Sequence, residues 1–256
     1  KFQQKGWRVI TSCRNAKDVM FLKNTYGLDA VCIDYEKPIT IKNGFKEALT
    51  LTGGRLDVLF NNGAYAIPAA VEDLPTEALR TIFEANLFGW HTLTRLALPV
   101  MFNQKSGRII QNSSVLGFAA MRFRGAYVAS KFALEGLTDT MRLELDGSGV
   151  HAILVEPGPI RTKIRDNAFL QFSKWINWKE SRQRSTYKNK LIPRLSLPKQ
   201  GKDLFELPAA SVSEAVWKAA TARKPRARYR VTLATTLMML TKSCLLYTSP
   251  SPRDSF

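Results

Sequence analysis

An α/β domain with a doubly wound parallel sheet is the fold that the sequence predicts. Short apolar runs rich in β-branched residues alternate with helix-length stretches along most of the chain. Such alternation is typical of parallel strands joined by crossover helices that cover both faces of a sheet. Because the length of 256 residues suits one large core, we expect a single domain over residues 1–243.

The first half of the chain provides three of the predicted strands. Trp7–Arg14 is short and β-branched, and it follows Gly6, a residue type that often ends helices. Ala30–Asp34 and Leu56–Asn61 are the next two apolar runs, and the polar stretch Ile39–Leu51 between them has the length of a helix. Strands and helices therefore alternate from the start.

The second half continues the alternation. One long helical pattern covers Thr76–Asn103 and another covers Gly125–Leu145. The apolar runs Arg108–Ser113 and Val150–Glu156 predict the strands that follow these helices, and Ser211–Arg223 predicts a further helix. This order is that of a Rossmann-like sheet, in which ligands bind beyond the carboxyl ends of the strands.

The segment 161–208 differs in composition from the rest of the chain. It is basic, carries Trp175, Trp178 and Tyr187, and lacks a clear strand pattern. A long insertion of this kind in a compact domain is usually a lid or a binding loop. We expect it to be a lid over the substrate; its aromatic residues suit a substrate wall and packing within the lid equally well.

Composition excludes several classes of protein. Cys13, Cys32 and Cys244 are too few and too irregularly spaced for a disulfide framework or a zinc site, and two histidines are too few for a histidine-based metal centre. We expect no metal and a cytoplasmic location. The longest apolar run, Val231–Leu240, is about half a membrane span, and no signal-peptide pattern opens the chain.

Positive charge is concentrated in two segments. The formal net charge is +17, and residues 161–202 hold 12 Lys or Arg against 2 acids, while residues 223–230 hold 5 with no acid. Such clusters attract nucleic acid, anionic lipid or phosphorylated ligands, but they are more often solvated surfaces. Since neither is a recognisable nucleic-acid-binding module, we expect no nucleic-acid partner. A peripheral contact with an anionic membrane stays as an alternative.

The pair Tyr127 and Lys131 is the first sign of catalytic chemistry. The two residues are four positions apart, so both side chains leave one face of a helix. An ammonium group beside a phenol lowers the pKa of the phenol from about 10, which suits proton transfer near neutral pH. The same spacing occurs on many amphipathic helices. Ser114 supports a catalytic role for the pair, because it lies 13 residues upstream of Tyr127 at the end of a predicted strand.

Five elements in a fixed order extend this pair to a family resemblance. They are Asn-Asn-Gly-Ala at 61–64, Asn86, Ser-Ser at 113–114, Tyr127-x-x-x-Lys131 and Pro-Gly-Pro-Ile-Arg-Thr at 157–162. The chain resembles the short-chain dehydrogenase/reductase family, and most of all its retinol and hydroxysteroid dehydrogenase-like branch, from its first residues to about Lys242. The joint order is far more specific than any single element.

The resemblance implies four catalytic residues. Tyr127 would be the general acid/base, and Lys131 would lower its pKa and hold the nicotinamide ribose. Ser114 would hydrogen-bond the substrate oxygen as its charge changes. Asn86 matches the position that holds a water molecule in the family's proton relay; an Asn at a helix kink with satisfied hydrogen bonds is the other interpretation.

The resemblance also implies a cofactor. Arg14 follows the first predicted strand, where an NAD enzyme of the family carries an acid, and a guanidinium there suits the 2′-phosphate of NADP. NADP is the expected cofactor, unless Arg14 is only an exposed loop cation. The other residues that the resemblance places at the cofactor are Asp34, Tyr35, Asn61, Gly63, Tyr127, Lys131, Pro157, Gly158, Ile160 and Thr162.

Three features depart from the family pattern. No Gly-x-x-x-Gly-x-Gly turn precedes Trp7, so we expect a chain that lacks the first strand and the glycine-rich loop. Gly63 precedes Ala64, where the family usually has the reverse order. The tail at 244–256 breaks from the preceding pattern, and we expect it to be a non-native, disordered segment.

The expected function is that of an NADP-dependent oxidoreductase that interconverts an alcohol and a carbonyl compound. The resemblance implies an apolar substrate, such as a retinoid, a steroid or a lipid-derived compound, and a homodimer or homotetramer. The hydride belongs to the cofactor, so the protein supplies position and proton transfer. The alternative to an enzyme is a catalytically idle protein that serves as an NADP-binding or regulatory scaffold.

Overall fold

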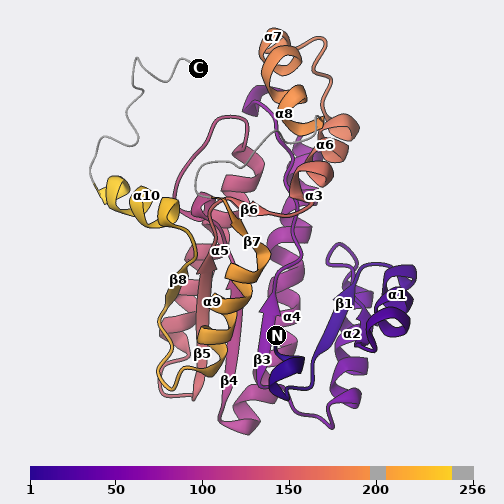
Figure 1. Ribbon diagram of the computed structural model, residues 1–256, viewed down its shortest axis with the longest axis vertical. Coiled ribbons are helices and arrows are strands. Elements are labelled where there is room, and N and C mark those ends of the chain that lie inside the picture. The colour runs from indigo at the N-terminus through magenta and orange to yellow at the C-terminus, as the bar shows by residue number, and fades with distance from the viewer. Residues whose placement is uncertain (197–205, 244–256) are drawn as a thin grey trace.

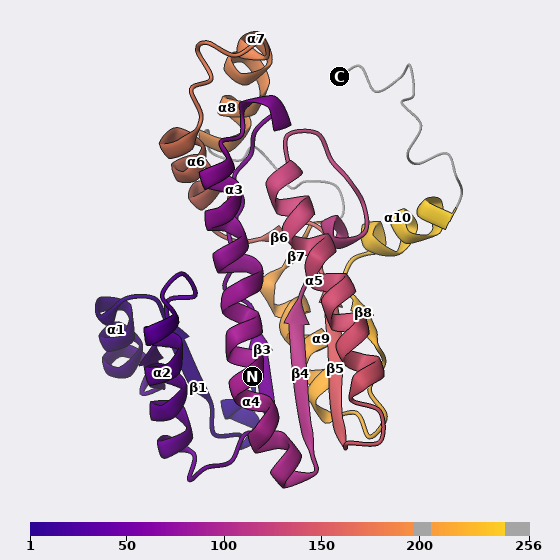
Figure 2. The ribbon, with the colours of Figure 1, turned by 180° about the vertical axis from the view of Figure 1, so that it is seen from behind.

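The computed structural model describes residues 1–196 and 206–243, and the predicted tail at 244–256 lies outside them. It confirms the α/β fold with parallel strands. Helix α9 (Ala209–Thr221) covers one face of the central sheet, while α4 (Gly89–Gln104) and α5 (Gly125–Glu144) cover the other (Figure 1 and, from behind, Figure 2). A group of short helices stands above the carboxyl ends of the strands (Figure 1).

The strands form two main sheets and one short pair, all parallel. They are β1 (Ile10–Cys13), β2 (Asp29–Cys32), β3 (Val58–Asn61), β4 (Gly107–Asn112), β5 (Val150–Glu156), β6 (Ile160–Arg161), β7 (Leu207–Pro208) and β8 (Arg228–Arg230). The larger sheet has the order β3-β4-β5-β8, and its register places Val58 opposite Arg108. β1 pairs only with β2, and Cys13 lies opposite Cys32. The parallel sheet is thus divided between β1 and β3.

Helices α1 (Ala16–Tyr26) and α2 (Pro38–Leu51) belong to the smaller sheet. Its apolar side chains, among them Val31 and Ile41, form a cluster with Leu93 of α4. At the other side, Phe2 and Trp7 make edge-to-face contacts with Trp217 of α9, with ring centroids 5.1 Å and 6.0 Å from that of Trp217. Side-chain packing therefore joins the two sheets where strand pairing does not.

The helix predicted over Thr76–Asn103 is not one regular helix. It begins as α3 (Thr76–Phe83), widens into the π-helical turn η3 (Glu84–Phe88) and continues as α4. Figure 1 shows the three segments following one another from the top of the molecule to its base. We refer to Thr76–Gln104 as the long helix.

The described part of segment 161–208 folds into α6 (Ile164–Trp175), α7 (Arg184–Thr186), the π-helical turn η5 (Tyr187–Leu191) and α8 (Ile192–Ser196). Contrary to the expectation of no strand, β6 and β7 frame the segment and pair with each other. Tyr187 is fully buried, and its hydroxyl donates to Asp73 at 2.6 Å and accepts from the Ala70 amide at 2.8 Å. This aromatic residue therefore anchors the segment to residues 70–73, and its role as a lid stays a prediction.

Across residues 1–196 and 206–243, no helix has the combination of length and apolar character that a membrane crossing needs.

Candidate active site

Ser114 stands just beyond the carboxyl end of β4, where the chain turns into the short helix η4 (Val115–Gly117). As the N-cap residue of η4, its hydroxyl oxygen accepts a hydrogen bond from the Leu116 amide at 3.1 Å. The same hydroxyl lowers the pKa of Tyr127 of α5, against the effect of burial, and both side chains line one cavity. The strand and the following helix thus bring Ser114 and Tyr127 together, as the sequence predicts.

Lys131 lies one helical turn after Tyr127, and only 1% of its surface is exposed. Its Nζ donates a hydrogen bond to the main-chain carbonyl of Asn112 at 2.7 Å. The same atom lies 4.3 Å from the centroid of the Trp90 ring and 5.6 Å from that of Tyr127. Since an aromatic face attracts a desolvated cation, the end of β4 and two rings together hold the Lys131 ammonium group.

Burial controls the acid–base properties of this pair. It raises the pKa of Tyr127 to about 12, against the opposing effect of the hydrogen bond with Ser114. It lowers the pKa of Lys131 to about 7, against the opposing effect of the Glu135 carboxylate. Desolvation of the phenolate dominates the pKa of Tyr127 in this structure, and the expectation that Lys131 lowers this pKa stays a prediction. Tyr127 is a neutral phenol at pH 7.

Asn86 lies in the π-helical turn η3 and is fully buried. Its side chain exchanges two hydrogen bonds with the backbone of Tyr65: Oδ1 accepts from the amide at 3.2 Å, and Nδ2 donates to the carbonyl at 3.0 Å. Nδ2 also donates to Ser130 Oγ at 3.2 Å. These bonds tie the long helix to α5 and to the 61–70 loop, and a role in a proton relay stays a prediction.

Ser114, Tyr127 and Lys131 line a cavity of about 1370 Å³. This exceeds the range of roughly 300–1,000 Å³ that is usual for small-molecule sites, so it has room for a cofactor and a substrate together. Four predicted cofactor residues lie on its wall because they follow β5, the neighbour of β4; they are Pro157, Gly158, Ile160 and Thr162.

The wall of the cavity also has polar groups that suit a nicotinamide cofactor. Asn112 Nδ2 donates to Asn62 Oδ1 at 2.7 Å. The other amide atom, Asn112 Oδ1, is buried and accepts no hydrogen bond within the described part of the chain. A buried acceptor of this kind favours a ligand that donates from an amide or a hydroxyl. The residues present therefore fit the carboxamide and ribose of such a cofactor.

The remaining predicted cofactor residues do not line this cavity. Arg14 is exposed, and its charge acts on Tyr65, where it opposes a rise in the pKa of that phenol. Asp34 forms an ion pair with Lys37 at 3.5 Å. Their contacts with a cofactor stay predictions. The five residues in question are Arg14, Asp34, Tyr35, Asn61 and Gly63.

Tyr35, Asn61 and Gly63 have evident roles in packing. The Tyr35 ring lies 6.2 Å from that of Trp90, centroid to centroid, and closes the space over Gly63, where an added Cβ would come within 2.9 Å of the ring. Asn61 is fully buried and donates through Nδ2 to Gln111 Oε1 at 2.9 Å. These contacts explain why small or amide residues occupy positions 61 and 63.

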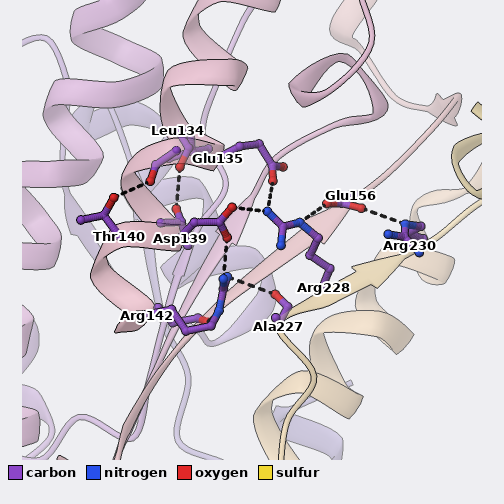
Figure 3. Close-up of polar contacts among 12 residues, drawn as sticks. Leu134, Glu135, Asp139, Thr140, Arg142, Glu156, Ala227, Arg228 and Arg230 are labelled. Atoms are coloured by element: carbon purple, nitrogen blue, oxygen red, sulfur yellow. Dashed lines mark hydrogen bonds and ion pairs between the residues drawn. The ribbon is translucent and has the colours of Figure 1, made fainter. Parts of the chain in front are cut away.

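An ion-pair cluster lies behind Lys131 and was not anticipated from the sequence (Figure 3). Arg228 of β8 contacts two carboxylates of α5: its Nη2 is 3.2 Å from Glu135 Oε2 and 2.5 Å from Asp139 Oδ2. Its Nε is 2.9 Å from Glu156 Oε1 at the end of β5. Burial, with Glu135 nearby, raises the pKa of Glu156 to about 7. We call Glu135, Asp139, Glu156 and Arg228 the Arg228 cluster.

Sequence spacing could have indicated two of the residues that surround Lys131. Trp90 is four positions after Asn86, and Glu135 is four positions after Lys131, so each shares a helix face with a predicted catalytic residue. Arg228 and Asn112 carry no such signal. They meet Lys131 or Glu135 because α5 packs on the sheet in which β4, β5 and β8 are paired.

Comparison with known proteins agrees with this geometry. The chain is 34% identical over 245 residues to the uncharacterized oxidoreductase YbbO of Escherichia coli, a match that covers 96% of this chain and 84% of that protein. It is 29% identical to the NADPH-dependent 3-dehydrocapnine reductase of Ornithobacterium rhinotracheale, over 90% of this chain and 81% of that protein.

Solved structures share the fold. A short-chain dehydrogenase from Streptomyces avermitilis superposes with a TM-score of 0.74 at 24% identity, over 93% of this chain and 84% of that one. The family model described as short chain dehydrogenase matches residues 1–171. With the family's fold and its Ser114, Tyr127 and Lys131 motif residues gathered at one cavity, this chain belongs to the short-chain dehydrogenase/reductase family.

Proposed function

We propose that the chain is an NADP(H)-dependent reductase of an aldehyde or a ketone. The observation that carries the proposal is the neutral phenol of Tyr127, which lies with Ser114 on the wall of the cavity. Carbonyl reduction needs a proton donor, and a phenol with a raised pKa remains one at neutral pH. Oxidation of an alcohol would need the phenolate, which burial disfavours.

Three side chains share the proton chemistry. Tyr127 gives its hydroxyl proton to the carbonyl oxygen as that oxygen gains negative charge. The hydroxyl of Ser114 has one hydrogen to donate, and with substrate bound it donates a hydrogen bond to the same oxygen while its own oxygen accepts from the Leu116 amide. Lys131 stabilises the phenolate left on Tyr127. When bound, the cofactor supplies the hydride, and one hydride plus one proton convert the carbonyl into an alcohol.

NADP(H), in preference to NAD(H), is supported by two observations. Arg14 is exposed just beyond the end of β1, where its guanidinium can reach a 2′-phosphate. One relative that matches over most of this chain is an NADPH-dependent reductase. The side chains of Val115, Leu116, Met121 and Ala168 give the cavity an apolar section next to Tyr127, which supports a substrate with a hydrocarbon portion.

The test is oxidation of NADPH by the purified chain with a panel of aliphatic and aromatic aldehydes and ketones. We expect turnover with NADPH, and a loss of kcat of at least about 100-fold in Tyr127→Phe, which keeps the ring and removes the proton. Undiminished turnover by Tyr127→Phe would exclude this mechanism. Binding of NADPH without turnover of any carbonyl compound would identify a cofactor-binding scaffold instead.

A further inference from the structure

Two cysteines end the paired strands of the smaller sheet. Cys13 is the last residue of β1 and Cys32 is the last residue of β2, and the register places them directly opposite each other. The Ile33 amide donates to the Cys13 carbonyl at 2.9 Å, so the ladder is intact up to this point. We call Cys13 and Cys32 the cysteine pair. Within the described residues both are free thiols, and both are half-buried.

Both side chains of the cysteine pair lie on the same face of the sheet. Side chains alternate between the two faces along a strand. Val31 and Ile33, the neighbours of Cys32, belong to the apolar cluster that includes Leu93 of α4. Cys32 therefore lies on the face opposite to that cluster, and Cys13, as its register partner in a parallel pair, lies there with it.

The spacing of the cysteine pair suits a disulfide bond. Neighbouring strands lie about 4.8 Å apart, so the Cα atoms of register partners fall inside the range of about 4.4–6.8 Å that disulfides span. The Cβ atoms start at a similar separation and need to approach slightly, because disulfides bring them to about 3.5–4.5 Å. Since each cysteine ends its strand, this adjustment disturbs one end of the ladder and leaves the other pairs in register. A disulfide with some strain is also the kind that is readily reduced again.

The reactivity of Cys13 depends on its surroundings. Burial first, and then Asp18 and Cys32, raise the pKa of the Cys13 thiol. The contribution of Cys32 agrees with the short separation that the strand register gives. Because the thiolate is the reactive form, a raised pKa makes Cys13 react slowly near neutral pH and faster under mildly alkaline conditions.

The cysteine pair adjoins the predicted cofactor residues of the smaller sheet. Arg14 follows Cys13 directly, and Asp34 comes two residues after Cys32. Asn15, the residue after Arg14, is the N-cap of α1. Arg14 is thus held between the end of a strand and the start of a helix, so a shift of Cys13 toward Cys32 moves the Arg14 backbone with it.

We propose that the cysteine pair is a redox modification site, at which a hydroperoxide converts the two thiols into a disulfide that weakens the binding of NADPH. The effect on NADPH rests on the proposed cofactor role of Arg14, whereas the formation of the disulfide does not. In the first step the hydroperoxide oxidises one thiol to a sulfenic acid and leaves as water or an alcohol. The second thiol then attacks that sulfur, the S–S bond forms, and the sulfenic oxygen leaves as water. In total the two sulfurs lose two electrons, which reduce the O–O bond, and the two thiol protons end on the oxygens.

The experiment treats the reduced, purified chain with hydrogen peroxide at about pH 8.5, where the thiolate is better populated. Mass spectrometry of tryptic peptides, prepared without reduction, then maps the linked cysteines. We expect a peptide pair joined through Cys13 and Cys32. NADPH should bind the oxidised chain at least about tenfold more weakly, as the loss of a charge-assisted hydrogen bond implies, and dithiothreitol should restore the affinity.

Single variants show which sulfurs are responsible. Cys32→Ser keeps the shape of the side chain and removes the partner sulfur, so it should bind NADPH like the reduced wild type and not respond to peroxide. Cys244→Ser, the matched control, should respond like the wild type. The proposal is overturned if the wild type forms no Cys13–Cys32 link, if the link changes the affinity for NADPH by less than about twofold, or if Cys32→Ser responds to peroxide as the wild type does. If the reduced wild type binds no NADPH, the cofactor proposal fails, and the mapped link alone decides whether the redox site exists.

Discussion

At the scale of single residues, the surroundings of Lys131 set the conditions for catalysis. The side chain is buried, yet it keeps three favourable neighbours: the Asn112 carbonyl, the Trp90 ring and the Glu135 carboxylate. Each of them favours the charged amine, while burial favours the neutral one. The balance places its pKa near neutrality, where a small change in the surroundings changes the charge.

The pH dependence of carbonyl reduction should report this balance. The pKa of Lys131 is lowered to about 7, so its ammonium group is present below that pH and lost above it, while Tyr127, with a pKa of about 12, stays protonated throughout. We therefore expect kcat/KM for reduction to fall as the pH rises through about 7. A profile that stays flat from about pH 6 to about pH 9 would show that the charge of Lys131 does not assist Tyr127.

Variants of Trp90 test the same assignment. Trp90→Leu removes the aromatic face, and a desolvated cation–π contact is worth roughly 2 kcal/mol, or about 1.5 pKa units. The midpoint of the pH profile should move down by about 1.5 units in Trp90→Leu. Trp90→Phe is the matched control: it also loses the hydrogen bond from Trp90 Nε1 to the Gly63 carbonyl, but it keeps a ring face and should keep the midpoint near that of the wild type.

Much of the candidate site could be predicted at this scale, because its signals are local. Ser114, Tyr127 and Lys131 follow from a strand end and a helical spacing. The raised pKa of Tyr127 could not be predicted, since it depends on how completely the surrounding elements exclude water around that ring.

At the scale of elements, the Arg228 cluster joins α5, β5 and β8 (Figure 3), and Glu135 lies on α5 one helical turn after Lys131. Glu156 ends β5, immediately before the predicted cofactor loop at 157–162. A cation that holds both Glu135 and Glu156 therefore fixes α5 relative to that loop. The stability of this arrangement depends on Arg228, because it is the shared partner of both carboxylates.

Arg228→Met should be strongly destabilising. The change leaves Glu135 and Glu156 without their shared cation, and breaking a buried ion pair costs about 3–5 kcal/mol. Glu156 keeps its contact with Arg230, whose Nε is 3.4 Å from Glu156 Oε2. Because buried carboxyls that lose a cation have higher pKa values in the folded state, they bind protons more tightly there, and stability is regained as the pH falls. Urea unfolding should show the full deficit at about pH 8 and a smaller one at about pH 5.5.

Arg80→Met is the control for this experiment. Arg80 forms an ion pair with Glu77 on α3 at 3.3 Å, and both side chains are about 70% exposed. Such surface pairs contribute little, so the free energy of unfolding should change by less than about 1 kcal/mol. An Arg228→Met deficit no larger than that of Arg80→Met, or one that does not depend on pH, would contradict the role given to the cluster.

Some helices and strands could be predicted with nearly correct bounds, whereas others were missed. Val150–Glu156 forms β5 with the predicted bounds, and Gly125–Glu144 ends one residue earlier than expected, because both have strong periodicity. β8 was missed, since its three residues alternate arginine and tyrosine and are held by pairing with β5. The π-helical turn was missed as well, because its hydrogen bonds differ from those of an α-helix while its sequence pattern does not.

At the scale of the whole molecule, the division of the sheet is the main departure from a continuous doubly wound fold. The fold class could be predicted from the alternation of strands and helices alone. The division could not, because it depends on which strand edges meet: β1 pairs on one edge with β2, whereas β4 pairs on both edges, with β3 and β5. The local stability of β1, which is paired on one edge, should therefore be lower than that of β4, which is paired on both.

Hydrogen exchange measures that difference directly. We expect the central amides of β4 to exchange at least about 100-fold more slowly than those of β1, because opening β4 breaks two ladders and opening β1 breaks one. Protection in α9 serves as an internal reference, since this helix packs on β4 and β5. Equal protection of β1 and β4 would mean that the aromatic contacts of Trp7 and Trp217 join the two sheets into one cooperative unit.

The long helix connects the 161–208 segment with both sheets. Its upper part, α3, contributes Ala78 and Ile82 to the apolar cluster that also contains Tyr187 of the 161–208 segment, and its lower part, α4, contacts α2 of the smaller sheet and β3 of the larger one. One continuous helical element therefore packs with the 161–208 segment at one end and with both sheets at the other. The turn η3 departs from α-helical hydrogen bonding at the middle of this element, and there Asn86 ties the long helix to the catalytic helix.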